Sequence, residues 1–394
     1  MPRVAFVLSN DRHHAAMFLP VAAALAARAG FDCSALSLCE FRGLRSPVEE
    51  FARAGIALRR AVPFSFRSPS AMAGGAGGPP SRRRRLVQGA AWAALLRRPL
   101  GGLLAARPDL VVLPNDAAYP YERIAALLHR RGVPFLLAQE GVRFPLPASA
   151  GRSVYGAGGA AAIAAWGEAS GEYFRAVGVP AERIHLTGNP RFDGIAATDW
   201  RAPAAALRAR FGLGAETLLL ISNPIDDQGF CSHAEKLRLL RALVEGLVPL
   251  HARPGFSLAV SLHARESAEE TRAALSGLAG AERVAVLDGA PLYPLLAASA
   301  AAVILASTVG LEALLFGLPL GVVALPGVGF VHDYVAGGGA LGLACDATLP
   351  ARAAELFALR GRSRPEAGAY LRRHLAVRSG ATERLADLIA RLTR

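Results

Sequence analysis

Short apolar runs alternate with helical stretches along the first half of the chain. Five runs have the length and composition of strands buried on both faces: Arg3–Ser9, Asp32–Leu38, Leu110–Pro114, Phe135–Ala138 and Ala161–Ala165. Ala15–Arg28, Tyr121–Arg130 and the residues around Gly171–Val177 have the pattern of helices that follow strands. Alternation of this kind predicts an α/β fold in which helices cover a parallel sheet.

The same alternation begins again near Asp199. Its predicted strands are Thr217–Ser222, Ser257–Leu262, Val284–Leu287, Ala301–Leu305 and Leu320–Leu325, and its helices include Ala234–Val248, Leu292–Ser299 and Leu311–Phe316. Two halves with one pattern, joined near Thr187–Ala205, predict two facing Rossmann-like domains with a central cleft, at 1–195 and 196–375. The helical end at 376–394 can pack back on the first domain. Ligands of such sheets bind at the carboxyl ends of the strands, so we expect the chemistry there.

Length and composition fit two buried cores. The chain has 394 residues, of which 53% are hydrophobic and 19% charged, and its 7% aromatic content is low for an all-β protein. The four cysteines lack the spacing of metal ligands, so we expect reduced thiols and no metal site. No apolar stretch is long enough to span a membrane, and the first residues run into a strand without the layout of a signal peptide. These features predict a cytoplasmic protein.

The net charge of +13 is carried almost wholly by arginine, since Lys236 is the only lysine. The excess indicates anionic partners such as a nucleotide, an acidic glycan or a membrane surface. Nucleic acid is disfavoured because no nucleic-acid-binding motif accompanies the charge. Within Pro63–Arg98, a Gly/Pro-rich loop leads into Arg82–Arg85 and then into the apolar stretch Leu86–Leu96. This order predicts an amphipathic helix that seats on the inner face of a membrane or binds an acidic acceptor, or else a solvated loop before an ordinary helix.

The segment that joins the fourth strand of the second half to a helix is a candidate phosphate cradle. Ser307 and Thr308 supply hydroxyl donors, and a helix that starts near Val309 and Gly310 presents unpaired N–H groups and the positive end of its dipole. Plain N-capping by either hydroxyl is the alternative. Glu312, one turn into the helix, is a candidate partner for ribose hydroxyls.

His263, Arg265 and Glu266 stand at the carboxyl end of the second strand of this half. An imidazole and a guanidinium at one strand end can neutralise a diphosphate, and Glu266 can orient either of them. Ser222 and Asn223 end the neighbouring first strand and are included among the predicted substrate contacts.

Glu140 ends a strand of the first half, with Arg143 close behind as a predicted substrate contact. A carboxylate there is suited to be the general base that removes the proton of an acceptor hydroxyl. Asp116, at the end of the neighbouring strand, is the rival base, and two such carboxylates should push each other's pKa values apart. N-capping or salt bridging by either residue is the alternative.

Two further loops carry candidate contacts. Asn10, His13 and His14 follow the first strand, and because no acidic or cysteine partner stands at a metal-binding spacing, we expect contact with an acceptor or a phosphate. His332 lies in a Gly-rich stretch after the fifth strand of the second half and is expected to face sugar or phosphate. Gly337–Gly342 fits G-x-G-x-x-G, but no clear strand precedes it and no βαβ unit follows, so it does not indicate a dinucleotide site.

Three motifs in the chain resemble the GT-B superfamily. They are Trp166–Glu168 (WGE), Leu186–Asp193 (LTGNPRFD), which contains Asn189, and Ser307–Leu314 (STVGLEAL). The resemblance covers residues 105–345, and its nearest branches are polysialyltransferase-like and Kdo-transferase-like enzymes, CDP-glycerol glycerophosphotransferases and UDP-GlcNAc 2-epimerases.

The resemblance implies roles for residues in both halves. In the polysialyltransferase-like enzymes an acidic-acidic-Gly motif provides the base, and residues 139–141 (QEG) match it with Gln in one acidic position. Their His-Pro motif, which meets the nucleotide phosphate, falls on His263, where Ala264 replaces the proline. Their paired hydroxyl motif falls on Ser307 and Thr308.

The epimerases share part of this set. Asp116, Glu140 and His263 would match an acidic residue, the Glu of a Glu-Ala-Gly segment and the His of a His-Arg-Arg-Glu segment. The epimerases' N-terminal Gly-Thr-Arg-Pro-Glu segment is absent, because Ser9–His13 reads SNDRH, and a further acidic residue expected after Glu140 has no counterpart. These two gaps favour transfer over epimerisation.

The resemblance therefore implies a metal-independent glycosyltransferase without a cofactor, of the hexosyl or CMP-sugar type. It would move a sugar from a CMP- or UDP-linked donor to a glycan or lipid-linked acceptor in bacterial surface polysaccharide biosynthesis. A UDP-GlcNAc 2-epimerase-like reaction is the alternative, and a catalytically silent carbohydrate- or nucleotide-binding protein is a second one.

Overall fold

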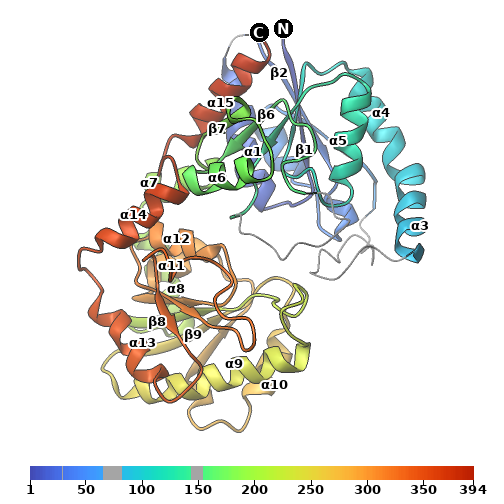
Figure 1. The fold of residues 1–394 in the computed structure, drawn as a ribbon. Coiled ribbons are helices and arrows are strands. Elements are labelled where there is room, and N and C mark those ends of the chain that lie inside the picture. Colours follow the sequence, from blue (N-terminus) through green and yellow to red (C-terminus); the bar gives the residue numbers. More distant parts are fainter. Residues whose placement is uncertain (29, 65–81, 143–153) are drawn as a thin grey trace. The chain divides into compact units, whose positions relative to one another are not determined.

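The computed structural model describes residues 1–28, 30–64, 82–142 and 154–394, with only the backbone of residues 82–85 (Figure 1). These residues form two compact units. Unit 1 combines Met1–Gly194 with Arg373–Arg394, and unit 2 is Ile195–Arg372. The end of the chain thus belongs to the same unit as its beginning.

Unit 1 is built on a parallel sheet of seven strands among the described residues. In chain order they are β1 (Arg3–Leu8), β2 (Asp32–Ser37), β3 (Ala57–Arg60), β4 (Leu110–Leu113), β5 (Phe135–Ala138), β6 (Ala162–Ala165) and β7 (Ile184–Leu186). The helices are α1 (His13–Ala27), α2 (Val48–Arg53), α3 (Arg82–Ala91), α4 (Arg97–Ala105), α5 (Tyr121–Arg130), α6 (Glu168–Ala176) and α15 (Ala381–Leu392), while α7 (Asp193–Ala197) leads into unit 2. The strand order β3-β2-β1-β4-β5-β6-β7 is that of a doubly wound sheet, and its direction of winding reverses between β1 and β4.

The central strand β1 is buried on both faces, which explains its continuous apolar sequence. Phe6 belongs to a core with α1 and α15, including Phe18 and Ile389, whereas Val7 belongs to a core with α4 and α5 that includes Leu100. Because successive side chains of a strand point to opposite faces, both helical layers gain apolar contacts from the same strand.

The C-terminal helix α15 is fastened to unit 1 by the LTGNPRFD motif as well as by apolar packing. The carboxylate of Asp193 accepts hydrogen bonds from the N–H groups of Ala381 (3.0 Å) and Thr382 (2.8 Å), in the first turn of α15. Gly188 has φ +79°, and a Cβ there would lie 2.7 Å from Cγ2 of Val377. The motif therefore has a structural function in joining the two ends of the chain.

Unit 2 repeats the topology. Its strands are β8 (Glu216–Ile221), β9 (Phe256–Ser261), β10 (Val284–Leu287), β11 (Ala301–Ile304), β12 (Leu320–Val323) and β13 (Leu341–Leu343), all parallel and in the order β10-β9-β8-β11-β12-β13. Its helices are α8 (Arg201–Phe211), α9 (His233–Leu247), α10 (Ala268–Leu275), α11 (Leu292–Ala298), α12 (Val309–Leu315), α13 (Leu349–Ala358) and α14 (Pro365–His374), which leads back into unit 1. Here the winding reverses between β8 and β11.

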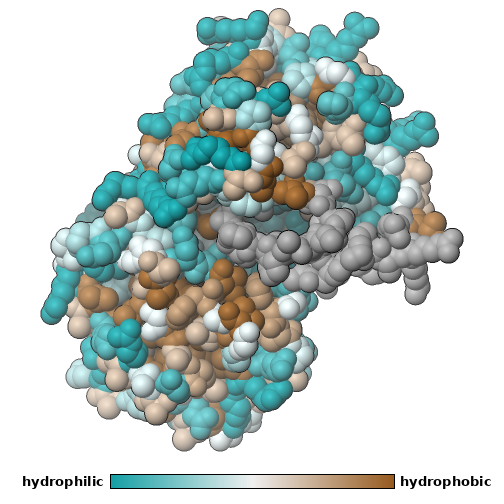
Figure 2. Space-filling model, in the orientation of Figure 1, coloured by the Kyte–Doolittle hydropathy of each residue, from teal (hydrophilic) through white to brown (hydrophobic). Residues whose placement is uncertain are grey.

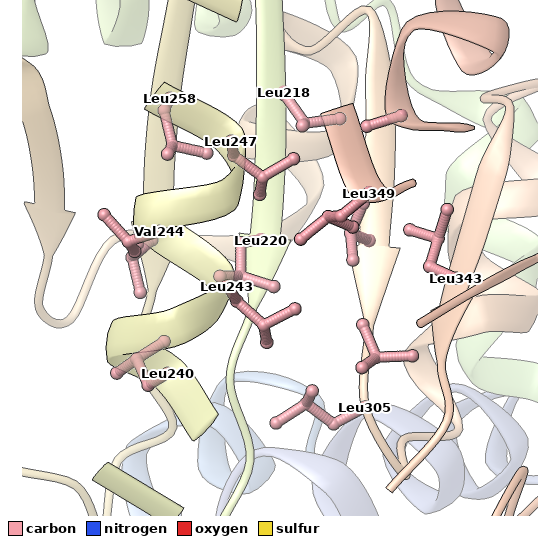
Figure 3. Close-up of a cluster of buried hydrophobic side chains, with 14 of the residues drawn as sticks. Leu218, Leu220, Leu240, Leu243, Val244, Leu247, Leu258, Leu305, Leu343 and Leu349 are labelled. Atoms are coloured by element: carbon pink, nitrogen blue, oxygen red, sulfur yellow. The ribbon is translucent and has the colours of Figure 1, made fainter. Parts of the chain in front are cut away.

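One face of the unit 2 sheet is covered by α9 and α13. Leu243 and Leu247 of α9 lie against Leu218 and Leu220 of β8, and Leu349 packs beside them (Figure 3). A capping box at Ser232 starts α9 in the register that points this apolar side at the sheet.

The predicted α/β fold with two Rossmann-like halves is confirmed, and the predicted central strands lie within a residue or two of the observed ones. Three strands escaped prediction: β3, β7 and β13. All three are edge strands of three or four residues and only partly buried, so they carry no continuous apolar run.

The helical interpretation of Leu86–Leu96 is also confirmed. The stretch belongs to α3 and to a π-helical segment, Trp92–Leu96, that continues into α4. The Gly/Pro-rich loop before it falls on residues outside the described part of the chain. Within the described part, every helix is too short or too polar to cross a bilayer.

Candidate functional site

In unit 1 the crevice of the sheet opens where β1 and β4 end, and polar side chains gather around Glu140, which follows β5. Oε2 of Glu140 lies 2.8 Å from Nε2 of His14, and Oε1 accepts a hydrogen bond of 2.6 Å from Nδ2 of Asn115. The Glu140 side chain is 25% exposed. The carboxylate is therefore held in one orientation by two donors and still reaches solvent.

The tautomer of His14 follows from its surroundings. The backbone N–H of Ser9 donates to Nδ1 of His14 at 3.1 Å, so the ring proton of the neutral imidazole sits on Nε2 and is donated to Glu140. His14 is 2% exposed. With Nδ1 accepting from Ser9, Nε2 is the donor and the Glu140 carboxylate is the acceptor.

Asn115 is fixed in the same way. Its Oδ1 accepts hydrogen bonds of 2.8 Å from the N–H groups of Ala117 and Ala118, which leaves Nδ2 to face Glu140. The hydroxyl of Tyr155 donates to the carbonyl of Pro114 and accepts from the N–H of Glu140, at 3.0 and 3.3 Å. The ends of β4 and β5 are thereby tied together beneath the carboxylate.

His13 lies against the same strand end. Its Nε2 is 2.6 Å from the carbonyl of Glu140, and its Nδ1 is 3.0 Å from Nη1 of Arg191, which can only donate. Burial lowers the pKa of His13 well below its usual value, and the neighbouring Arg191 cation and His14 lower it further. Asn10 supports this loop, because its Oδ1 accepts the N–H of His13 at 2.7 Å.

Asp116 follows β4, the strand next to β5, and its hydrogen-bond partners differ from those of Glu140. Its two oxygens accept hydrogen bonds of 2.8 Å from the N–H groups of Gly156 and Gly158, and it is 2% exposed. These bonds engage both carboxylate oxygens with backbone. Arg143, predicted as a contact, lies outside the described residues.

Asn189 is buried, at 1% exposure, and its Oδ1 accepts the N–H of Arg191. Its Nδ2 is a buried donor that no described residue uses. Gln139, which replaces an acidic residue of the related motif, donates through Nε2 to Ser170 and to the carbonyl of Gly141. A carboxylate could not donate to the carbonyl of Gly141, which explains the amide at this position.

In unit 2 the carboxylate of Glu266 joins three elements. Oε1 accepts from Oγ of Ser222 at 2.7 Å and lies 2.5 Å from Nζ of Lys236 on α9, while Oε2 accepts the N–H of His263 at 2.7 Å. The side chains of Lys236 and Glu266 are 6% and 5% exposed, and Asp226 lies 3.3 Å from the same ammonium group. Glu266 thus holds the backbone of His263 rather than its ring.

His263 and Arg265 are exposed at the end of β9. The N–H of Arg265 donates to Nδ1 of His263, and its guanidinium pairs with Asp227 at 2.9 Å. Partial desolvation lowers the pKa of His263, and the Arg265 cation adds to the shift. A neutral imidazole with its proton on Nε2 results, which is a hydrogen-bond donor suited to a phosphate oxygen.

Asn223 lies where the winding of the unit 2 sheet reverses, between β8 and β11, and is 5% exposed. Its amide bonds both the carbonyl and the N–H of Ala306, at 2.9 and 3.3 Å, and so ties the end of β8 to the end of β11. Ser307, Thr308 and Val309 follow and are partly exposed. They are the predicted cradle residues that lie at the surface.

Ser307 Oγ accepts the N–H of Val309 at 3.3 Å, so this hydroxyl also caps the start of α12. Gly310 is required for packing, since a Cβ there would lie 2.6 Å from the ring of Tyr334. Glu312 and His332 are 1% and 5% exposed. Contact between either of these side chains and a ligand stays a prediction.

The structure adds residues that the sequence did not single out as part of a site. Asn115 and Tyr155 hold Glu140, Arg191 faces His13, and Lys236 neutralises Glu266. Two of these residues have a feature in the sequence that could have singled them out. Arg191 lies within the LTGNPRFD motif, and Lys236 is the only lysine of the chain. Across the described part of the chain, no three His, Cys, Asp or Glu side chains are grouped so that they could hold a metal ion.

Neither a protein-family model nor a curated protein sequence matches the chain. Solved structures do resemble it. S. aureus MnaA with UDP is 13% identical with a TM-score of 0.69, covering 99% of this chain and 96% of that one. UDP-GlcNAc 2-epimerase from Neisseria meningitidis bound to UDP-GlcNAc is 14% identical with a TM-score of 0.65, covering 99% and 98%.

A third solved structure also resembles the chain. Anabaena Alr3699/HepE in complex with UDP and glucose is 14% identical with a TM-score of 0.58, covering 99% of this chain and 100% of that one. At such identities the likeness shows the fold. The chain therefore has the GT-B-type fold that its motifs predicted.

The lowered pKa of His13 predicts a pH dependence of stability. Because this pKa is lowered on folding, the folded state binds fewer protons than the unfolded chain once the pH falls below about 6.5. The contribution of His13 to the free energy of unfolding is therefore fully present above that pH and is lost as the pH falls below it. When the pH is lowered from 7 to 5, the free energy of unfolding of His13→Gln, measured in urea titrations, should fall by about 1–2 kcal/mol less than that of the wild type. His129→Gln, at an exposed position, is the control and should follow the wild type. Parallel curves for all three proteins would show that His13 is not held neutral.

The buried pair of Lys236 and Glu266 predicts a large loss of stability on removal of one partner. Lys236→Met should lower the free energy of unfolding by about 3–5 kcal/mol, because it leaves the Glu266 carboxylate buried without its cation. Arg352→Met, which removes an exposed pair with Glu355, should cost less than about 1 kcal/mol. The double variant Lys236→Met/Glu266→Gln should lose less than Lys236→Met alone. Equal losses for Lys236→Met and Arg352→Met would contradict the buried pair.

Proposed function

We propose that this protein is a glycosyltransferase, which moves a sugar from a CMP- or UDP-linked donor to a hydroxyl of a glycan or lipid-linked acceptor. The observation that carries the proposal is the carboxylate of Glu140, which stands at the switch point of unit 1, is fixed by His14 and Asn115, and remains one-quarter exposed. A preoriented carboxylate that reaches solvent is suited to act as a general base.

Glu140 acts on the acceptor in this mechanism. It takes the proton of the acceptor hydroxyl, whose oxygen forms a bond to the anomeric carbon of the donor sugar while the bond from that carbon to the phosphate oxygen breaks. The nucleotide leaves with the electron pair of the broken bond. His14 keeps the carboxylate aligned through Nε2–H. Asn10 and His13 belong to the loop that would contact the acceptor.

Unit 2 would bind the nucleotide. The Nε2–H of His263, the guanidinium of Arg265 and the surface segment at Ser307, Thr308 and Val309 are the donors available to the phosphates. Arg265 would exchange its bond to Asp227 for one to phosphate. The ligands bound in the similar structures, which are UDP, UDP-GlcNAc, and UDP with glucose, support a nucleotide sugar as the donor.

Epimerisation of a nucleotide sugar is the second candidate, and the similarity to the UDP-GlcNAc 2-epimerase from Neisseria meningitidis favours it. Inverting a carbon requires that a proton be removed from one face of the sugar and returned to the other. Of the two carboxylates that follow β4 and β5, Glu140 is partly exposed, whereas both oxygens of Asp116 are bonded to backbone N–H groups. One available carboxylate supports transfer, which needs one base.

Glu140→Gln separates the two roles assigned to the units. In a thermal-shift panel of CMP, CDP, UDP, GDP and dTDP, one nucleotide at about 100 times its Kd should stabilise wild type and variant alike by about 2.7 kcal/mol. Turnover with the corresponding sugar nucleotide and an acceptor should fall by about 10²- to 10⁴-fold in the variant. Glu182→Gln, at an exposed position of unit 1, should retain wild-type turnover. Full turnover by Glu140→Gln would remove it as the base, and a panel without any stabilising nucleotide would contradict nucleotide binding by unit 2.

A further inference from the structure

The positive charge of the chain is concentrated in one stretch. Between Glu50 and Asp109 the sequence contains eleven arginines and no acidic residue or lysine, whereas the net charge of the whole chain is +13. The stretch includes α3, the π-helical segment Trp92–Leu96 and α4 of unit 1. Two of these arginines, Arg97 and Arg98, are exposed on α4, and exposed positive charge is complementary to an anionic partner.

The outward side of this helical stretch is apolar where a surface helix is normally polar. Leu86 is 69% exposed and Val87 is 45% exposed. Ala90, Ala93 and Ala94 continue the exposed side. Leu96 and Leu100 are buried in the core, so the stretch has a buried apolar side in addition to the exposed one. Figure 2 shows hydrophobic and hydrophilic residues side by side on the part of unit 1 that carries α3 and α4.

Arginines stand before and after the exposed apolar residues in the sequence. Arg82–Arg85 begin α3, and Arg97 and Arg98 follow the exposed alanines on α4. The backbone of α3 is described there, and the charge of its first turn follows from the sequence alone.

A hollow lies between the helical stretch Trp92–Leu104 and the end of α5. Its volume is about 480 Å³, with Arg97, Arg130 and Arg131 around it and Trp92, Leu104 and Leu127 among its apolar lining residues. Glu122 on α5 is the acidic group near this surface, and it lies 3.9 Å from Arg123. Three guanidinium groups over an apolar floor can accommodate a phosphate that is attached to a hydrocarbon chain.

We propose that the surface formed by α3, the π-helical segment, α4 and the end of α5 docks on an anionic lipid bilayer. Leu86 and Val87 enter the headgroup region, and Arg97, Arg98 and Arg130 contact lipid phosphates. Charge complementarity selects an anionic partner, and the exposed Leu86 and Val87 select a bilayer over a soluble polyanion, which offers no apolar phase.

The test is flotation of the full-length protein with vesicles of phosphatidylcholine alone or with about one-third phosphatidylglycerol. The wild type should bind only the anionic vesicles, and added salt should release it. Arg97→Gln/Arg98→Gln should lower partitioning by about thirty-fold, as expected for two basic residues at a charged membrane surface. Leu86→Ser/Val87→Ser, which keeps the charge, should lower it by about tenfold.

The matched control is Arg362→Gln/Arg378→Gln, which removes the same charge from exposed positions elsewhere and should bind like the wild type. All three variants should keep the nucleotide-induced thermal shift, so a loss of binding is separated from misfolding and from the proposed nucleotide site. Three results would overturn the proposal: equal loss in the control, equal binding to neutral vesicles, or binding of a soluble anionic polysaccharide without binding of vesicles.

Discussion

The hydrogen bond between His14 and Glu140 is the interaction on which the account of unit 1 rests. It joins the first turn of α1, which follows β1, to the end of β5, across the point where the winding of the sheet reverses. Because the N–H of Ser9 donates to Nδ1 of His14, Nε2 is the donor to the carboxylate and the bond has one direction. Asn115 bonds the other oxygen of the same carboxylate, so hydrogen bonds from two neighbouring segments orient Glu140.

In unit 2 an ammonium group helps to hold the carboxylate of Glu266. Glu266 is almost fully buried, and Lys236 compensates it while Ser222 and the N–H of His263 satisfy the remaining lone pairs. A carboxylate held in this way positions a backbone segment and is not available for catalysis. Each unit thus holds a carboxylate at the carboxyl edge of its sheet, partly exposed after β5 in unit 1 and buried after β9 in unit 2.

The sequence predicted the parts of the fold that depend on continuous apolar runs, because central parallel strands are buried on both faces. It missed edge strands such as β3, where exposed arginines interrupt the pattern. Glu140 and His14 were both predicted as site residues, but they are 126 positions apart and no local pattern announces their bond. The burial of Glu312 and the engagement of Asp116 with Gly156 and Gly158 depend on tertiary packing, which spacing along the chain does not encode.

The central claim is that Glu140 serves transfer to an acceptor. The most direct test is proton NMR of the stabilising sugar nucleotide, incubated with the full-length protein in D₂O, first without and then with a glycan or lipid-linked acceptor. The account predicts that the sugar keeps its ring protons and its configuration until an acceptor is added, when the nucleotide is released. Deuterium at carbon 2 together with the appearance of an epimer in the absence of acceptor would contradict it and assign the protein to epimerisation.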